Sequence, residues 1–410
     1  MSRSARPVLI VVAGTDPVYR GYCTKQVAAA YDIALIDAKP PTWQGDLVVD
    51  HEVADTRDPV AVTAAGLALA ERHAIAGVVT WDEYALVPAA ALAARLGVPG
   101  STVASMNAAR DKAATRRLLA EHGVPSARSI RVRDLTQATA AASRIGYPVV
   151  LKPASHAASI GVIRVDDPDE LPHRWEFAAA GASAQGPEGR GVLVEEYLRG
   201  PEISVECATV GGATTALAVT RKEVGFAPYF EETGHTVTAG DPLLPHVAPI
   251  AAQAVRALGI SAGIQHVEMR LTTSGPRIIE VNARIGGDLI GTLVRLATGL
   301  DLPRIAADIA CGNVPALTAT AHRTAAITIL YPPVSGTLDT VRLPVRPGAE
   351  PHWLHQATWL REPGDRVTLP PHGDLTTARV GFLIVTADSP EQARDRLALL
   401  TDRLTLTVTA

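Results

Sequence analysis

The sequence has few cysteines, and none of them is placed to form a disulfide framework or a zinc site. The 410 residues include three cysteines, Cys23, Cys207 and Cys311, which lie far apart without a CxxC pair. This pattern fits reduced thiols and a cytoplasmic protein. The first apolar run, residues 7–13, is too short for a signal-peptide core or a membrane span, so we expect a buried strand there and no membrane partner.

The sequence also lacks an excess of charge and is poor in lysine. The formal net charge is −4 and no run of lysine or arginine stands out, so a nucleic-acid partner is not expected. Where a lysine persists in an arginine-rich chain, its point charge can be what the site requires, although chance retention is the alternative. The five lysines are Lys25, Lys39, Lys112, Lys152 and Lys222.

The first hundred residues alternate apolar runs with alanine-rich stretches. This alternation predicts buried parallel strands connected by helices. The predicted strands are 7–13, 32–36 and 76–80, and the predicted helices are 22–30, 59–73 and 85–96. The turn after the first strand lacks GxGxxG spacing, so a dinucleotide fingerprint is not supported.

The rest of the chain divides into two further predicted units. A helix beginning near residue 107 should stop at Gly123, and a helical segment leads to an apolar strand at 147–153. Strand and turn patterns then continue to about residue 315. We therefore predict units at 1–104, at 105–315 with a small lid subdomain at about 125–198, and at 316–410.

Two glutamates in one predicted hairpin suggest a metal site. If residues 265–271 pair with 277–283, Leu271 lies opposite Arg277 and Glu268 lies opposite Glu280. Opposed carboxylates destabilise a sheet unless a cation lies between them. Asn282 shares the face of Glu280, and such oxygen ligands suit Mg²⁺. The alternative is an exposed hairpin whose charges are solvated.

Two segments have features of a nucleotide site. Lys152 ends a strand and is followed by a loop of small residues from Ser155 to Gly161, whose backbone N–H groups could approach phosphates. Walker A spacing is absent, and an ordinary surface hairpin is the alternative. The strand exit at residues 195–198 could present backbone groups to a purine, with Glu202 placed to reach a ribose.

In order along the chain, these segments resemble the ATP-grasp superfamily. The motifs are DK at 111–112, VVLKP at 149–153, the loop ending SIGV, EEYLRGPE at 195–202, and Glu268 with EVNARIGG at 280–287. The resemblance covers roughly residues 105–310. It implies an ATP-grasp fold of mixed α/β and α+β class, with an N-terminal parallel α/β (Rossmann-like) domain and a central core. The last unit is similar to the C-terminal α+β lid-type domain of the bacterial L-amino acid ligases.

The resemblance implies a role for each matched residue. The ATP-binding residues would be Lys112, Lys152, Ser159, Gly161, Glu195, Glu196, Tyr197, Leu198 and Glu202. The ligands of Mg²⁺, or of Mn²⁺ in its place, would be Glu268, Glu280 and Asn282. Arg284 would stabilise an acyl phosphate and the tetrahedral intermediate. The substrate contacts would be Glu232, His235, Arg284, Gly287 and Asp288.

Three of these positions have more than one interpretation. His235 could act as a general base or anchor a substrate carboxylate. Asp288 stands where some ligases carry a bulky residue, and it could face a substrate ammonium group or serve as the N-cap of the following helix. Lys222 could contact an anionic substrate or phosphate, or it could be a surface lysine.

The implied reaction joins an amino acid carboxylate to an amine or a second amino acid. ATP would convert the carboxylate to an acyl phosphate, and the products would be ADP, phosphate and a dipeptide or γ-glutamyl-type amide. Relatives commonly form homodimers, although no sequence feature requires one here. The alternatives are a purine-pathway or biotin-carboxylase-like enzyme of the same superfamily, and an ATP-binding module without catalysis.

Overall fold

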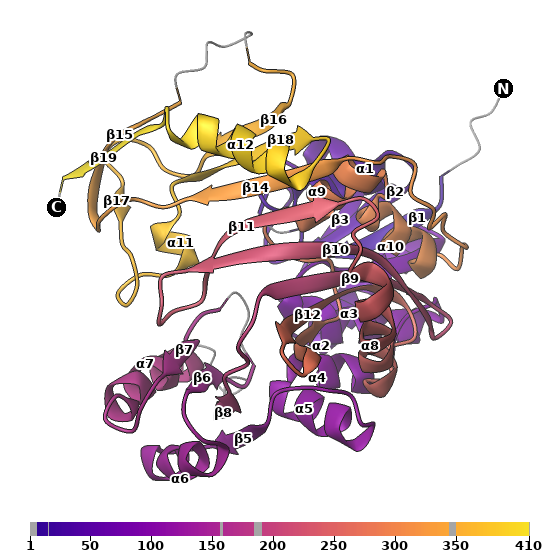
Figure 1. The fold of residues 1–410 in the computed structure, drawn as a ribbon. Coiled ribbons are helices and arrows are strands. Elements are labelled where there is room, and N and C mark those ends of the chain that lie inside the picture. The colour runs from indigo at the N-terminus through magenta and orange to yellow at the C-terminus, as the bar shows by residue number, and fades with distance from the viewer. Residues whose placement is uncertain (1–5, 15, 156–158, 184–190, 344–349, 410) are drawn as a thin grey trace.

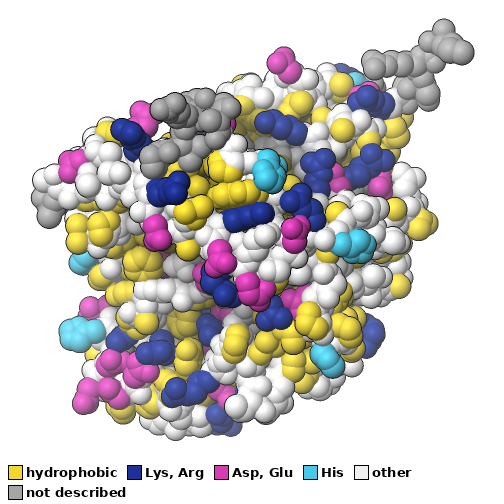
Figure 2. All heavy atoms as spheres, turned by 45° about the horizontal axis from the view of Figure 1, so that its top comes forward, with side chains coloured by type: hydrophobic (Ala, Val, Ile, Leu, Met, Phe, Trp, Pro, Cys, Tyr) yellow, Lys and Arg dark blue, Asp and Glu magenta, His cyan; other side chains and the backbone are white. Residues whose placement is uncertain are grey.

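The computed structural model describes residues 6–14, 16–155, 159–183, 191–343 and 350–409. An eight-stranded sheet runs across the molecule, and a small sheet with α6 and α7 stands apart from it at the lower left of Figure 1. No helix among the described residues is long and apolar enough to cross a membrane. Basic and acidic side chains are interspersed on the face that Figure 2 shows, which fits the small net charge.

The N-terminal unit is a four-stranded parallel sheet of order β3-β2-β1-β4, as the alternating pattern predicted. Its strands are β1 (Val8–Val12), β2 (Asp32–Asp37), β3 (Val48–Val53) and β4 (Ile75–Val79), and its helices are α1 (Gly21–Ala28), α2 (Pro59–Arg72) and α3 (Leu86–Leu96). Two apolar clusters bury its central strands. Strand β3 was not predicted, because it lies at the sheet edge and exposes every second residue.

The helix predicted from residue 107 to Gly123 is wrong in one respect, because the structure has two helices there. These are α4 (Val103–Arg110) and α5 (Lys112–Glu121). Asp111 separates them, and its carboxylate accepts hydrogen bonds from the backbone N–H groups of Ala113 and Ala114. An N-cap of this kind starts a new helix, and it places Lys112 in the first turn of α5.

The lid is a four-stranded antiparallel sheet of order β5-β8-β6-β7. Its strands are β5 (Ser129–Val132), β6 (Val149–Pro153), β7 (Ile163–Val165) and β8 (Val192–Glu196). Helices α6 (Leu135–Ile145) and α7 (Leu171–Ser183) pack against it and enclose a separate apolar core. The lid is thus a small unit with its own core, and the ends of its strands β6 and β8 face the rest of the molecule.

The eight-stranded sheet has the order β13-β12-β9-β10-β11-β14-β18-β16 and continues across the predicted boundary at residue 315. Its strands are β9 (Glu202–Val210), β10 (Ala213–Gly225), β11 (Glu231–Thr238), β12 (Gly263–Thr272), β13 (Gly275–Asn282), β14 (Thr324–Leu330), β16 (Leu354–Trp359) and β18 (Gly381–Ala387). The accompanying helices are α8 (Leu244–Ala257), α9 (Ile290–Thr298), α10 (Leu302–Ala310), α11 (Leu375–Ala378) and α12 (Pro390–Thr401). A third small sheet joins β15 (Gly336–Arg342) to β17 (Arg366–Val367) and β19 (Thr405–Thr409).

The hairpin of β12 and β13 has the predicted Glu268–Glu280 pair but not the predicted register throughout. Leu271 lies opposite Pro276, whereas the sequence analysis placed it opposite Arg277. The register shifts by one residue between Glu268 and Met269, so the pairing predicted at the turn is wrong while the glutamate pair is confirmed. A β-bulge of this kind is a local feature that strand periodicity does not reveal.

Candidate active site

Two adjoining clefts bring most of the predicted site residues together. The first has about 760 Å³ of open volume and lies between the lid and the large sheet; the predicted residues that line it are Lys112, Lys152, Ser159, Glu195, Glu196, Tyr197, Leu198, Glu202, Glu268 and Glu280. The second has about 1500 Å³; the predicted residues that line it are Ser159, Glu202, Glu232, Glu268, Glu280, Asn282, Arg284, Gly287 and Asp288. Glu268 and Glu280 line both clefts and therefore stand at their border.

Lys152, at the end of β6, belongs to a buried ion-pair cluster. Its Nζ lies 2.6 Å from Glu195 Oε2, and Arg116 donates to both oxygens of the same carboxylate at 2.8 and 2.9 Å. Burial alone would raise the pKa of Glu195, but Arg116 and Lys152 outweigh it and lower that pKa to about 2. The Glu195 side chain therefore orients Lys152. The sequence analysis did not predict this contact, since it assigned residues 195–198 to a strand exit that could present backbone groups to a purine.

Lys112 supplies a second cation at the border of the clefts. Its Nζ lies 2.9 Å from Glu280 Oε1, and its side chain is only 10% exposed. Burial opposes the charge, but the carboxylate of Glu280 outweighs burial and raises the pKa of Lys112. Two lysines from different elements, α5 and β6, thus converge on one end of the first cleft.

The strand exit after β8 forms another part of the lining of the first cleft. Leu198 is buried, and the ring of Tyr197 lies 6.3 Å from that of Phe230, another lining residue. The Glu196 carboxylate is held 2.9 Å from Arg277. The Glu202 carboxylate forms an ion pair with Arg270, with 2.7 Å between Oε2 and Nη2. Apolar and aromatic groups with carboxylates nearby are chemically suited to a purine nucleoside.

The predicted loop of small residues is only partly described. Ser155, Ser159 and Gly161 belong to the described residues, whereas residues 156–158 lie outside them. Ser159 has a positive φ of 54° and lines both clefts. Gly161 lines a different cavity, between the lid and residues 371–377, so the structure does not bring it into either of the two clefts.

The opposed glutamates have the ligand chemistry of a divalent-cation site. Glu268, Glu280 and Asn282 all line the second cleft and offer carboxylate and amide oxygens, which are ligands that Mg²⁺ prefers. Cationic side chains now face both carboxylates: Lys112 contacts Glu280, and His266 Nε2 lies 3.1 Å from Glu268. The two carboxylates therefore attract cationic side chains, and the oxygen ligands that they and Asn282 offer fit the predicted Mg²⁺ ion.

His266 is a site residue that the sequence analysis missed. Its Nδ1 lies 2.8 Å from the buried carboxylate of Glu206, while its Nε2 faces Glu268. Burial would lower the pKa of His266, but Glu206 outweighs it and raises that pKa to about 9. The imidazolium thus holds Glu268 in place. Its position two residues before Glu268, on the same strand face, was the one signal in the sequence.

Arg284 lies two residues beyond the end of β13 and is held by the N-terminal unit. Its Nε donates to Glu83 Oε2 at 2.7 Å, and its Nη2 donates to Asn282 Oδ1 at 3.3 Å. Both Arg284 and Glu83 line the second cleft. Glu83 was not predicted, because it lies 201 residues from Arg284 and no local pattern connects them.

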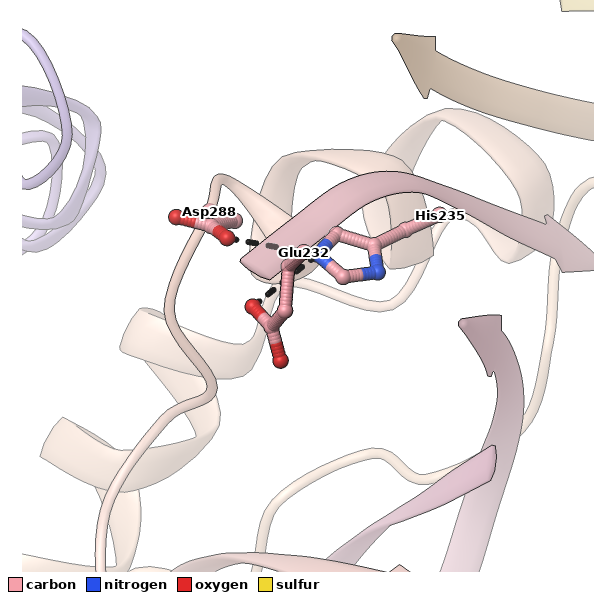
Figure 3. A group of neighbouring side chains, drawn as sticks. All are labelled: Glu232, His235 and Asp288. Carbon is pink, nitrogen blue, oxygen red and sulfur yellow. Dashed lines mark hydrogen bonds and ion pairs between the residues drawn. The ribbon is translucent and has the colours of Figure 1, made fainter. Parts of the chain in front are cut away.

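Glu232, His235 and Asp288 form a compact group beside the second cleft (Figure 3). His235 Nε2 lies 3.5 Å from Glu232 and 3.4 Å from Asp288, and the histidine side chain is fully buried. Burial would lower the pKa of His235, but these two carboxylates outweigh it and raise that pKa. The ligand atoms of these three side chains lie within 4.8 Å of one another, a spacing that suits a metal ion. Cationic side chains already contact both carboxylates, since Lys222 pairs with Glu232 and Arg379 with Asp288.

Asp288 does not serve as the N-cap that was one of its two interpretations. The N-cap of α9 is Leu289, which makes no side-chain capping bond. The Asp288 carboxylate instead accepts two hydrogen bonds from Arg379, at 2.6 and 3.0 Å. Arg379 comes from the segment before β18, so the C-terminal unit reaches the second cleft. The N-cap prediction failed because this partner lies 91 residues away.

Lys222 is not a surface lysine, which was one of its predicted alternatives. Its side chain is 1% exposed and its Nζ contacts the carboxylates of Glu202, Glu232 and Glu268. Two carboxylates that line both clefts, Glu202 and Glu268, and one that lines the second, Glu232, therefore share one buried cation. Local sequence gave no sign of this, because the three carboxylates come from three different strands.

Known proteins resemble this chain in sequence and in fold. A family model described as "ATP-grasp domain" matches residues 145–292. A D-alanine–D-alanine ligase of Desulforudis audaxviator is 32% identical over 49% of this chain and 74% of its own length. The uncharacterized protein y4rH of Sinorhizobium fredii is 28% identical over 95% of this chain and 80% of its own length.

The fold itself matches a solved ligase over its whole length. The crystal structure of an L-amino acid ligase from Bacillus licheniformis superposes with a TM-score of 0.82, at 22% identity, and the match covers 100% of both chains. The resemblance seen in the sequence motifs is confirmed, and the chain belongs to the ATP-grasp family of ligases.

Proposed function

We propose that this protein is an ATP- and Mg²⁺-dependent ligase that joins an amino acid carboxylate to an amine. The observation that carries the proposal is the position of Glu268 and Glu280 at the border of two clefts. Lys112 and Lys152 lie on the side suited to a nucleotide, and Arg284 lies on the other side. A phosphoryl group transferred at this border would pass from one cleft to the other.

The first cleft is the proposed ATP site. The strand exit at residues 195–198 would receive the adenine and Glu202 the ribose, while the lysines would face the phosphates. Positioning and cationic stabilisation dominate phosphoryl transfer, and the two buried lysines supply both. Glu268, Glu280 and Asn282 would hold Mg²⁺, which supplies charge neutralisation between the phosphates when it is bound.

The second cleft is the proposed place of amide formation. A substrate carboxylate oxygen attacks the γ-phosphorus of ATP, the bond to ADP breaks, and an acyl phosphate forms. The amine nitrogen then attacks the carbonyl carbon, phosphate leaves with the bonding electrons, and the amine loses a proton. Arg284 would stabilise the negative charge that develops on the carbonyl oxygen, since a guanidinium presents several donors in a fixed arrangement.

His235 fits a supporting role better than that of a free base. Glu232 and Asp288 raise its pKa against the effect of burial, so more of it is protonated at neutral pH. We propose that it holds these two carboxylates in place. The Glu232 carboxylate, 23% exposed, would face the amine substrate.

The similarity to an L-amino acid ligase supports amino acids as substrates, with a dipeptide or γ-glutamyl-type amide as product. The second cleft, with carboxylates and guanidinium groups in its lining, is chemically suited to the charged groups of amino acids. A cytoplasmic location and a homodimer remain expectations from the sequence.

The test is a survey of amino acid pairs and amines with ATP and Mg²⁺, in which ADP and phosphate are measured and products are identified by mass spectrometry. We expect ADP together with a new amide. Glu280→Ala should abolish turnover because it removes a metal ligand, whereas Glu121→Ala, which alters an exposed ion pair with Arg117 on α5, should not. A fully active Glu280→Ala variant would contradict the metal assignment. Bicarbonate-dependent ADP release without an amide would indicate a carboxylating enzyme, and ATP binding without ADP formation would indicate a binding module.

A further inference from the structure

Lys222 contacts three carboxylates, two of which line both clefts and one of which lines the second. It belongs to β10, between β9 and β11 in the large sheet. Its Nζ lies 3.2 Å from Glu202 and 3.4 Å from Glu268, and it also pairs with Glu232. With a side chain that is 1% exposed, the lysine has little access to water as an alternative partner.

The three carboxylates face different parts of the site. Glu268 lines both clefts at the proposed metal position, Glu202 lines both and shares the first with the strand exit at residues 195–198, and Glu232 lines the second cleft but not the first. Glu202 also has Arg270 at 2.7 Å, and Glu268 has His266 at 3.1 Å. Glu232 depends more on Lys222, because its other cationic contact in the described chain, His235, is 3.5 Å away.

We propose that Lys222 is a positioning residue that couples occupancy of the metal site to the substrate-side carboxylate Glu232. The proposal rests on the proposed function, because it takes Glu268 as a ligand of the Mg²⁺ that accompanies the nucleotide. A divalent cation bound to Glu268 repels the Lys222 ammonium group at this short range. Lys222 then pairs more strongly with Glu232, which fixes that carboxylate once Mg²⁺ and nucleotide are in place.

The coupling acts in both directions because linkage is reciprocal. If Glu232 loses its charge, Lys222 pairs more strongly with Glu268 and competes with Mg²⁺. If Lys222 loses its charge, this competition disappears and Glu268 binds Mg²⁺ more readily. The two substitutions therefore shift the Mg²⁺ requirement in opposite directions. Loss of structure alone would weaken binding in both variants.

The experiment measures ADP binding at graded Mg²⁺ concentrations, so it needs neither turnover nor an identified substrate. Glu232→Gln should raise the half-saturating Mg²⁺ concentration about fivefold or more, and Lys222→Met should lower it by a similar factor. The double variant should resemble Lys222→Met, because Glu232 acts through the lysine. Arg221→Met is the matched control: the neighbouring strand residue is 46% exposed, pairs with Asp241 at 2.9 Å, and should leave the Mg²⁺ requirement unchanged.

The possible outcomes distinguish a failure of this coupling from a failure of the proposed function. An unchanged Mg²⁺ requirement in Glu232→Gln, or a shift in the same direction as in Lys222→Met, would overturn the coupling. Should Lys222→Met fail to fold, Lys222→Gln takes its place, because it removes the same charge with a polar side chain and the opposite direction of the two shifts still decides the question. ADP binding that is independent of Mg²⁺ in the unaltered protein would overturn the metal assignment itself.

Discussion

Replacement of Glu195 by glutamine tests how the nucleotide cleft is built. The Glu195 carboxylate is 3% exposed and compensates two buried cations, Lys152 at 2.6 Å and Arg116 at 2.8 and 2.9 Å. Glu195→Gln retains the shape of the side chain and removes its charge. Two cations are then left buried without their counter-ion, which is the costly way to break such a cluster.

The structure sets the size of the expected effect. Burial opposes the charge of Glu195, yet Arg116 and Lys152 lower its pKa from an ordinary 4.5 to about 2. That change corresponds to about 3 kcal/mol of stabilisation of the charged carboxylate. The native pKa is depressed, so this stability is present above pH 4.5 and is lost as the pH falls from 4.5 towards 2. Glu195→Gln should therefore lower the free energy of unfolding at pH 7 by about 3 kcal/mol.

The same substitution should change nucleotide binding. Burial, the largest influence, already lowers the pKa of Lys152, and Glu195 opposes that effect. Without the carboxylate, Lys152 loses its proton more easily and with it the charge that attracts phosphate. ADP should bind more weakly to Glu195→Gln at pH 8 than at pH 6.5, and this pH dependence should be smaller in the unaltered protein.

Urea denaturation and ADP titrations at two pH values provide the assay. Glu196→Gln is the matched control, because Glu196 is the next residue on β8 but is 22% exposed and pairs with Arg128 and Arg277 near the surface. Its substitution should cost no more than about 1 kcal/mol. A Glu195→Gln variant as stable as the control, with ADP affinity independent of pH, would refute this account of Lys152.

Two further substitutions test the loop after the metal strand. A Cβ at Gly286 would lie 2.7 Å from His266 Nδ1, whereas one at Gly287 would meet nothing within 4 Å. Gly286→Ala should therefore lower the free energy of unfolding, measured in urea, by about 1–3 kcal/mol, while Gly287→Ala is the control. Equal stability of the two variants would contradict the packing described. Asp288→Asn removes a carboxylate that raises the pKa of His235, so an NMR titration of that imidazole should give a lower pKa than in the unaltered protein. An unchanged titration would show that Asp288 does not act on His235.

Local sequence patterns predicted the structure where the position of a residue depends on its neighbours along the chain. Continuous apolar runs marked β1, β2 and β4, because strands buried on both faces have no polar positions. The assumed hairpin pairing placed Glu268 opposite Glu280, although the structure has a different register at the turn. Period-two geometry placed Asn282 on the face of Glu280, and both line the second cleft.

The remaining features depend on distant partners. Arg379 meets Asp288 from 91 residues away, and Glu83 meets Arg284 from 201 residues away, so neither contact has a local signature. Lys222 is buried because strands β9, β11 and β12 each bring a carboxylate to it. Sheet order decides such contacts, and sequence periodicity does not determine the order of strands.

The fate of the carboxylate oxygen tests the central claim most directly. An amino acid labelled with ¹⁸O in its carboxylate is incubated with ATP, Mg²⁺ and an amine, and the released phosphate is analysed by mass spectrometry. The proposed acyl phosphate predicts that each released phosphate carries one oxygen from the carboxylate and that the nucleotide product is ADP. Unlabelled phosphate alongside a new amide, or AMP in place of ADP, would contradict the proposed mechanism.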